Sequence, residues 1–195
     1  MNSYPSWNLH LDNVEDWAYF DNAFTAEECD ALIKYGREQQ LDDAKINNTK
    51  DTVDSIRKSK VAFIPPTEFM APYYQRVSDI VLSVNEQFFK FDLHGFSEHF
   101  QFTEYETPGG KYESHVDRAY RIRVRKLSIV VQLTDPETYT GGDLEWISSI
   151  EHPRLLPRTR GTLIAFPSYV VHRVTPVTSG TRNSLVGWVT GKQFR

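Results

Sequence analysis

The sequence has few of the features that mark several protein classes. Its 195 residues contain a single cysteine, Cys29, so an intrachain disulfide is excluded. The net charge of −4 argues against a general nucleic-acid-binding protein, which is usually strongly basic. No apolar run approaches the length of a membrane span, and the N-terminus has no basic segment followed by an apolar one. We therefore expect a cytoplasmic protein without nucleic-acid or membrane partners.

The composition fits one globular domain. Hydrophobic residues make up 39% of the chain and charged residues 25%, which are ordinary values for a soluble protein with a sizeable core. No internal repeat or low-complexity linker divides the chain. We expect a single domain over residues 1–195, with a helix-rich support region over 1–95 and a strand-rich core over 96–195.

Helical signals dominate the first half. Thr25 and Glu28 form a capping box, and the apolar spacing after it predicts a helix that ends at about Gln39. A second apolar set at helical spacing predicts a helix over about residues 70–89. Between the two helices, residues 59–64 could form a strand that ends at a Pro-Pro pair.

Short alternating segments separated by turns dominate the second half. Pro and Gly residues at 108–110 and 141–142 mark two of these turns. Many short strands of this kind are typical of a sandwich or barrel. We therefore predict an α+β, mainly β fold: a double-stranded β-helix, or jelly roll, with the N-terminal helices packed outside.

One pair of residues in the second half predicts a metal site. The His-x-Asp spacing alone is weak evidence, because His10 and Asp12 have it too, in a segment without strand context. His115 and Asp117 differ in that they follow a Gly-Gly turn and lie on the same side of a predicted strand. A further histidine, His172, lies in a late apolar strand.

These three side chains indicate a catalytic metal. Two imidazoles and one carboxylate on one face leave other coordination positions open, as in the facial triad of non-heme Fe(II) oxygenases. Imidazole suits several metals, so the ligands alone do not select iron. Arg182 follows His172 by ten residues, and its planar guanidinium suits the carboxylate of an acid cosubstrate.

The stretch from Tyr105 to Trp188 resembles the 2-oxoglutarate- and Fe(II)-dependent oxygenases, and specifically their prolyl 4-hydroxylase branch. The N-terminal part resembles bacterial and phage members more loosely. The matching positions, in the order and spacing of that family, are Tyr105, Gly109, Gly110, Tyr112, His115, Asp117, Leu127, Ser128, Gly141, Gly142, Leu144, Gly161, Phe166, His172, Val174, Gly180, Arg182 and Trp188.

The resemblance implies a hydroxylase that oxidatively decarboxylates 2-oxoglutarate to succinate and CO2. His115, Asp117 and His172 would ligate Fe(II), and Arg182 would bind the C5 carboxylate of 2-oxoglutarate. Dioxygen would be the second cosubstrate, with ascorbate as a supporting reductant. Because the ligand carboxylate of Asp117 is present, hydroxylation is favoured over halogenation.

Three further positions are implied to lie at the cosubstrate. Ser184 should point the same way as Arg182 and support its contact. Tyr105 matches a family tyrosine that lies against 2-oxoglutarate. Gln132 replaces a tyrosine that touches the same carboxylate in many relatives. An amide can donate that hydrogen bond, although a polar residue on a half-exposed strand explains Gln132 equally well.

Substrate contacts are implied for Trp188 and Arg125. The nucleic-acid demethylating branch has an arginine at the position of Trp188, so this residue argues against base repair, and it would otherwise be a core aromatic. Arg125 belongs to a basic run directly after the metal pair and aligns with a family arginine at the substrate groove; the alternative is a solvated loop. The run consists of Arg118, Arg121, Arg123, Arg125 and Lys126. The polar segment 41–58 falls where relatives have a loop that closes over peptide.

The sequence leaves several alternatives open. A peptidyl proline is the leading substrate, and a free amino acid or another small molecule could use the same site. A jelly-roll module that binds metal without turnover is disfavoured by the intact set of triad and arginine. The regiochemistry, the oligomeric state and the biological role are not indicated.

Overall fold

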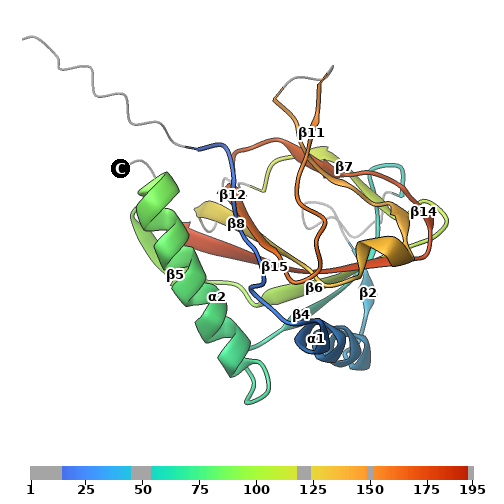
Figure 1. The fold of residues 1–195 in the computed structure, drawn as a ribbon, viewed down its shortest axis with the longest axis horizontal. Helices are drawn as coiled ribbons and strands as arrows, with labels where there is room; N and C mark the ends of the chain where they lie inside the picture. Colours follow the sequence, from blue (N-terminus) through green and yellow to red (C-terminus); the bar gives the residue numbers. More distant parts are fainter. Residues whose placement is uncertain (1–14, 45–53, 118–123, 149–151, 193–195) are drawn as a thin grey trace, which may run out of the picture.

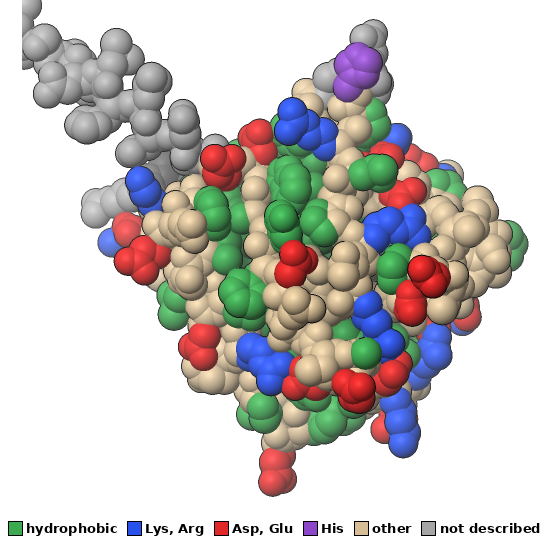
Figure 2. Space-filling model, viewed as in Figure 1, with side chains coloured by type: hydrophobic (Ala, Val, Ile, Leu, Met, Phe, Trp, Pro, Cys, Tyr) green, Lys and Arg blue, Asp and Glu red, His purple; other side chains and the backbone are tan. Residues whose placement is uncertain are grey.

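The computed structural model describes residues 15–44, 54–117, 124–148 and 152–192 (Figure 1). Two large antiparallel sheets, a two-stranded sheet and two α-helices form the fold of the described residues. Within the described ranges, no helix is long and apolar enough to cross a membrane. On the face seen in Figure 2, Lys and Arg side chains are interspersed with Asp and Glu.

The major sheet has eight strands. Seven of them lie in the order β1-β12-β8-β15-β6-β4-β2, and the eighth, β5, pairs with β15. Its central strand, β15, is the longest and pairs with both β8 and β6. The strands are β1 (Ala18–Phe20), β2 (Asp42–Asp43), β4 (Lys60–Ile64), β5 (Leu93–Phe96), β6 (Phe100–Glu106), β8 (Arg125–Gln132), β12 (Leu163–Pro167) and β15 (Thr181–Gly191).

The minor sheet has five strands in the order β11-β10-β13-β7-β3. These strands are β3 (Arg57–Lys58), β7 (Lys111–His115), β10 (Leu144–Trp146), β11 (Arg154–Leu155) and β13 (His172–Val174). The single-turn 3-10 helix η2 (Pro136–Thr138) directly precedes β9 (Thr140–Gly141). Strand β9 pairs with β14 (Val177–Ser179) in a short two-stranded sheet. An apolar cluster joins the inner faces of the two sheets and includes Val130, Ile164, Phe166, Leu144 and Val174. This arrangement confirms the predicted double-stranded β-helix.

Both α-helices cover the other face of the major sheet, on the side away from β7 and β11 (Figure 1). Helix α1 (Ala26–Glu38) begins after the predicted capping box, in which the Thr25 side chain accepts from the Glu28 amide and the Glu28 carboxylate accepts from the Thr25 amide. Helix α2 (Ala71–Val84) continues into a π-helical segment, η1 (Asn85–Phe89). The predicted helices are therefore confirmed, with a change of hydrogen-bonding pattern near the end of the second.

Strand β8 faces two cores because its side chains alternate. Leu127, Ile129 and Val131 belong to the cluster under the helices. Val130 belongs to the cluster between the sheets. Successive residues of a strand point to opposite faces, so one strand serves both layers.

Helix α1 approaches the major sheet closely at Gly36. A Cβ atom at this position would lie 2.5 Å from ring carbons of Phe102 on β6. Cys29 and Leu32 on the same helix are fully buried. The close approach of backbone to ring therefore requires glycine here.

The N-terminal half contributes more strand than its helical signals indicate. Besides the predicted strand at β4, it supplies β1 and β2 to the major sheet and β3 to the minor sheet. The predicted long loop over 41–58 thus contains β2 near its start and β3 at its end, and residues 45–53 lie outside the described residues. Strands of two or three residues are too short for alternation to reveal them.

Candidate metal centre

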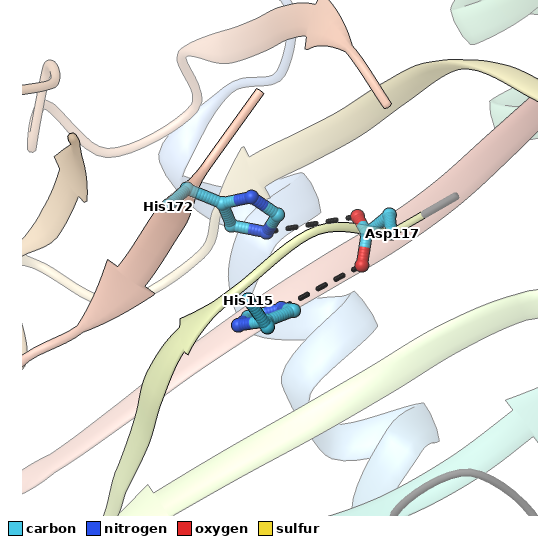
Figure 3. Close-up of side chains that lie close together, drawn as sticks. All are labelled: His115, Asp117 and His172. Carbon is cyan, nitrogen blue, oxygen red and sulfur yellow. Dashed lines mark ion pairs between the residues drawn. The ribbon is translucent and has the colours of Figure 1, made fainter. Parts of the chain in front are cut away.

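Strand pairing in the minor sheet brings the three predicted ligands together (Figure 3). His115 ends β7 and His172 begins β13, and the two are direct partners in the antiparallel register. Asp117 follows two residues after His115, and its amide donates to the Ser168 carbonyl at 3.0 Å. One ligand atom from each of the three residues lies within 4.8 Å of the others, so the group could hold a metal ion.

The two imidazoles face the carboxylate through the same ring nitrogen. Nε2 of His115 lies 3.6 Å from Oδ1 of Asp117, and Nε2 of His172 lies 3.6 Å from Oδ2. Nδ1 of His115 is 2.7 Å from the Glu113 carbonyl oxygen, and Nδ1 of His172 is 3.0 Å from that of Val170. Because a carbonyl can only accept, each Nδ1 carries the proton and each Nε2 has a lone pair for a metal.

The electrostatics favour the protonation states that a metal needs. Burial lowers the pKa of His172 to about 4, although the charge of Asp117 acts in the opposite direction. Burial opposes ionisation of Asp117, but His172, His115 and the Trp188 N–H outweigh it and hold the pKa of this carboxyl well below its usual range. At neutral pH, His172 is therefore neutral and Asp117 is ionised, which are the forms that bind a divalent cation.

Hydrogen bonds from the major sheet fix the Asp117 carboxylate. Its Oδ2 accepts from Ser128 Oγ at 2.7 Å and from Trp188 Nε1 at 2.9 Å. Ser128 also lies 3.0 Å from Ser168, between the hydroxyl oxygens. Trp188 is buried and points inward, as predicted, and its polar edge meets Asp117. The carboxylate is therefore oriented by two strands that do not carry the histidines.

Aromatic rings hold the imidazole planes. Tyr112 stacks on His115, with ring centroids 3.5 Å apart, and Phe166 lies 4.6 Å from His172. The Arg57 guanidinium lies over the Tyr112 ring, 4.4 Å from its centroid. Burial raises the pKa of Tyr112. No motif in the sequence predicts a role for Tyr112 or Arg57 at the site, although Tyr112 is one of the positions that match the family.

Arg182 lies in the interior between the two sheets, only 1% exposed. Its Nη2 donates to Gln132 Oε1 at 2.9 Å, and its guanidinium lies 5.4 Å from the Tyr105 ring centroid. Within the described part of the chain, Nε and Nη1 of Arg182 have no hydrogen-bond partner. A buried arginine with two unpaired nitrogens is a strong candidate to bind an anion.

The surroundings of Arg182 explain two other sequence features. Gly142 has a φ of +64°, and a Cβ there would lie 3.1 Å from Cδ of Arg182, so glycine leaves room for the arginine stem. Ser184 is buried two residues further along β15. Tyr105 belongs to the same apolar cluster as Phe166, the ring that contacts His172. One apolar cluster therefore contacts both the arginine and the candidate metal ligands.

Gln132 has a different arrangement from the one predicted. Its amide nitrogen donates to the Pro157 carbonyl at 2.9 Å, and its oxygen accepts from Arg182. Both ends of the amide are thus held by the protein, because β8 places Gln132 directly beside the guanidinium. It is also fully buried, not half-exposed. The structure gives Gln132 the geometry to orient Arg182, in place of the expected donor directed at an anion.

Arg125 also has partners within the protein. Its Nε and Nη2 donate to the two carboxylate oxygens of Glu98, and its Nη1 donates to the Asp117 carbonyl. The guanidinium lies over the Trp188 ring, 3.8 Å from the centroid. The rest of the predicted basic run includes Arg118, Arg121 and Arg123, which lie outside the described residues.

A facial set of two histidines and one aspartate, beside a buried arginine in a double-stranded β-helix, defines a metal-dependent oxygenase-type site. Residues 100–190 match the model of the 2OG-Fe(II) oxygenase superfamily. Over this range, from β6 to β15, the chain is similar to that superfamily, and solved prolyl 4-hydroxylases resemble it over most of its length.

Solved structures and sequence relatives show the same similarity. A Pseudomonas putida prolyl-4-hydroxylase is 25% identical, with a TM-score of 0.73 over 91% of this chain and 94% of that one. A viral collagen prolyl hydroxylase from Paramecium Bursaria Chlorella virus-1, 20% identical, has the same fold, with a TM-score of 0.69 over 91% of this chain and 97% of that one. A PKHD-type hydroxylase from Synechococcus sp. (strain CC9311) is 44% identical over 81 residues, which are 41% of this chain and 36% of the relative. The chain thus spans less than half the length of such curated relatives.

Proposed function

We propose that this protein is an Fe(II)- and 2-oxoglutarate-dependent hydroxylase. The observation that carries the proposal is the buried Arg182, whose Nε and Nη1 lack a partner in the described structure. An uncompensated buried charge destabilises a fold by several kcal/mol, on the order of 3–5 kcal/mol where a partner is removed. A bound carboxylate would offset this cost, beside the apolar cluster that also contacts the triad.

The residues present fit the iron. His115 and His172 offer Nε2 lone pairs, and Asp117 offers an oriented carboxylate. When bound, iron, 2-oxoglutarate and dioxygen would supply the oxidation, with succinate and CO2 as coproducts. The task of the chain is to hold these groups, to orient the substrate and to keep water out of the site.

The residues around Arg182 fit the far carboxylate of the cosubstrate. A guanidinium forms bidentate pairs with carboxylates, and two of its three nitrogens are available here. Gln132 holds the remaining nitrogen and so sets the plane of the fork. Tyr105 provides an apolar wall, and Ser184 offers a buried hydroxyl on the same strand face.

Within this function, a peptidyl proline is the proposed substrate. Support comes from the Pseudomonas putida prolyl-4-hydroxylase, which is similar over nine-tenths of the chain. A tryptophan at position 188, where nucleic-acid demethylating relatives have arginine, is consistent with a substrate that is not a nucleobase. A cytoplasmic location and a supporting role for ascorbate remain predictions.

An anaerobic titration tests the proposal. Protein loaded with Fe(II) is titrated with 2-oxoglutarate while the weak visible charge-transfer band of the chelate is followed. The band should appear, and Arg182→Ala should need about 10–100-fold more cosubstrate, since a hydrogen bond to a charged group contributes about 1.5–3 kcal/mol. Arg76→Ala, which removes an arginine that pairs with Glu28 between the helices, should behave like the unsubstituted protein.

The outcomes distinguish the proposed cosubstrate from the proposed substrate. No band with iron in place would contradict the proposed cosubstrate. A normal band without succinate release on addition of proline-containing peptides would leave the cosubstrate assignment intact but contradict the substrate. Succinate release with free proline, and none with peptides, would instead support the small-molecule alternative.

A further inference from the structure

Glu98 belongs to no sequence motif of the metal site and lies in the connection between β5 and β6. Its two carboxylate oxygens accept from Nε and Nη2 of Arg125, at 2.8 and 2.6 Å. The side chains of Glu98 and Arg125 are 20% and 19% exposed. A bidentate pair with this much shielding is held more firmly than a typical surface ion pair.

Arg125 reaches Asp117 by two routes. Its Nη1 donates to the backbone carbonyl of Asp117 at 3.2 Å. Its guanidinium also packs on the Trp188 ring, and the Nε1 of that ring donates to Oδ2 of the Asp117 carboxylate at 2.9 Å. The backbone and the side chain of the candidate metal ligand are therefore both held by contacts that begin at Arg125.

The contacts form a chain from Glu98 to the carboxylate. Glu98 fixes the plane of the Arg125 guanidinium, and this plane sets the position of the indole below it. The link from Arg125 to Trp188 is a cation–π contact, so a displaced guanidinium would no longer hold the indole in place. Without Glu98, the guanidinium could rotate towards solvent or towards Asp117, and neither position would keep the indole N–H on Oδ2.

We propose that Glu98 is a positioning residue of the metal centre, which acts through Arg125 and Trp188 to fix the orientation of the Asp117 carboxylate. The inference rests on the metal site of the proposed function, but not on the identity of the cosubstrate or substrate. It also reassigns Arg125, which the sequence placed at the substrate groove, to a support of the metal ligand.

The size of the effect should lie below that of a direct partner. Groups that contact a metal ligand change metal affinity by about 10–100-fold when they are removed. Because Glu98 acts through two intervening side chains, Glu98→Gln should weaken metal binding by roughly 3–10-fold, which lies beneath that range. Trp188→Phe, which removes the indole N–H and keeps an aromatic ring, should weaken binding by about 10-fold.

The experiment uses Co(II) as the probe and needs neither cosubstrate nor turnover. The full chain is titrated with Co(II), and both the dissociation constant and the visible ligand-field bands are recorded for Glu98→Gln, Trp188→Phe and the double variant. Glu28→Gln is the matched control, because it neutralises another Arg-Glu pair that joins distant segments, while glutamine still completes the capping box. Thermal midpoints are measured on the same samples.

Support for the proposal requires three results. Glu98→Gln shows weaker Co(II) binding and altered bands, Glu28→Gln shows neither, and the double variant loses less affinity than the product of the two single losses. Co(II) affinity and bands in Glu98→Gln equal to those of Glu28→Gln would overturn the proposal, whatever the change in thermal midpoint. Fully multiplicative losses would overturn the route through Trp188. If the unsubstituted chain does not bind Co(II), the metal site of the proposed function fails, and this inference fails with it.

Discussion

The two nitrogens of each histidine in the site have separate tasks. Nδ1 is occupied by a backbone carbonyl from the same strand or turn, so Nε2 is left to face Asp117. The direction of each lone pair is therefore set by the local backbone and not by the metal. These hydrogen bonds hold the two imidazole planes, which limits the reorganisation that metal binding requires.

His172→Ala should abolish tight Fe(II) binding. A direct ligand contributes more than its outer partners, whose loss alone weakens metal binding by about 10–100-fold, so a loss of more than about 100-fold is expected. Iron content after equilibrium dialysis measures it. His99→Ala, at an exposed histidine, is the control and should keep full occupancy. Full iron occupancy in His172→Ala would contradict the assigned triad.

Gln132→Glu should block the binding of an anion to Arg182. The new carboxylate would lie at hydrogen-bond distance from Nη2 of Arg182, where Gln132 Oε1 now lies at 2.9 Å. It would neutralise the guanidinium and compete with an incoming carboxylate, so 2-oxoglutarate binding should weaken at least about tenfold. Metal affinity should not change, since Gln132 does not contact the triad. Unchanged cosubstrate binding, followed by the charge-transfer band, would contradict the role of Arg182.

Among the secondary-structure elements, helix α1 depends on its closest contact with the sheet. Gly36→Ala should destabilise the protein although alanine is the better helix former. The gain in helix propensity is about 1 kcal/mol. A Cβ at 2.5 Å from the Phe102 ring forces the helix or the ring to move, which typically costs about 1–3 kcal/mol. Urea denaturation should show a lower midpoint; a higher one would mean that the helix shifts without strain.

Sequence patterns predicted the elements that have enough residues to show a period or a cap. The capping box at Thr25 located α1, and alternation located β8 together with the site residues on β15. The short strands β1, β2 and β3 could not be predicted, because two or three residues show no alternation and their pairing depends on distant partners. Glu98 is similar: only the fold brings it to Arg125, 27 residues further along the chain.

The residue types at the site were predictable, but their orientations were not. The triad and Arg182 follow from motif and spacing, and the structure brings the three metal ligands together. Which end of the Gln132 amide faces Arg182 depends on the Pro157 carbonyl, which comes from another part of the chain. The partner of Arg125 was not predictable either, because Glu98 belongs to no motif.

The protein as a whole keeps its one thiol in the core under the helices. Cys29 is fully buried, and its Sγ lies 4.0 Å from the Gln132 carbonyl oxygen. Burial raises the pKa of Cys29 to about 11 from an ordinary value near 9. The folded protein should therefore resist alkylation by iodoacetamide at pH 8, and the thiol should react fully in denaturant. Rapid labelling of the native protein would contradict this burial.

The same shift gives a pH dependence of stability. The pKa is higher in the folded state than in the unfolded chain, so the folded state keeps a proton that the unfolded state loses. The contribution is fully present below about pH 9 and declines as the pH rises towards about 11. Cys29→Ala should show a smaller decline over this window in urea denaturation. An identical decline in both proteins would mean that other groups cause it.

The two faces of β8 have a consequence for how such a protein can change over time. Residues on one face pack under helices α1 and α2, and residues on the other face, such as Ser128 and Gln132, contact the site. Mutations that repack the helical layer can therefore accumulate with little effect on the chemistry, as long as the strand keeps its register. A single-residue insertion in β8 would exchange the two sets and destroy both layers at once. The strand should tolerate substitution on its helical face and resist insertion along its whole length.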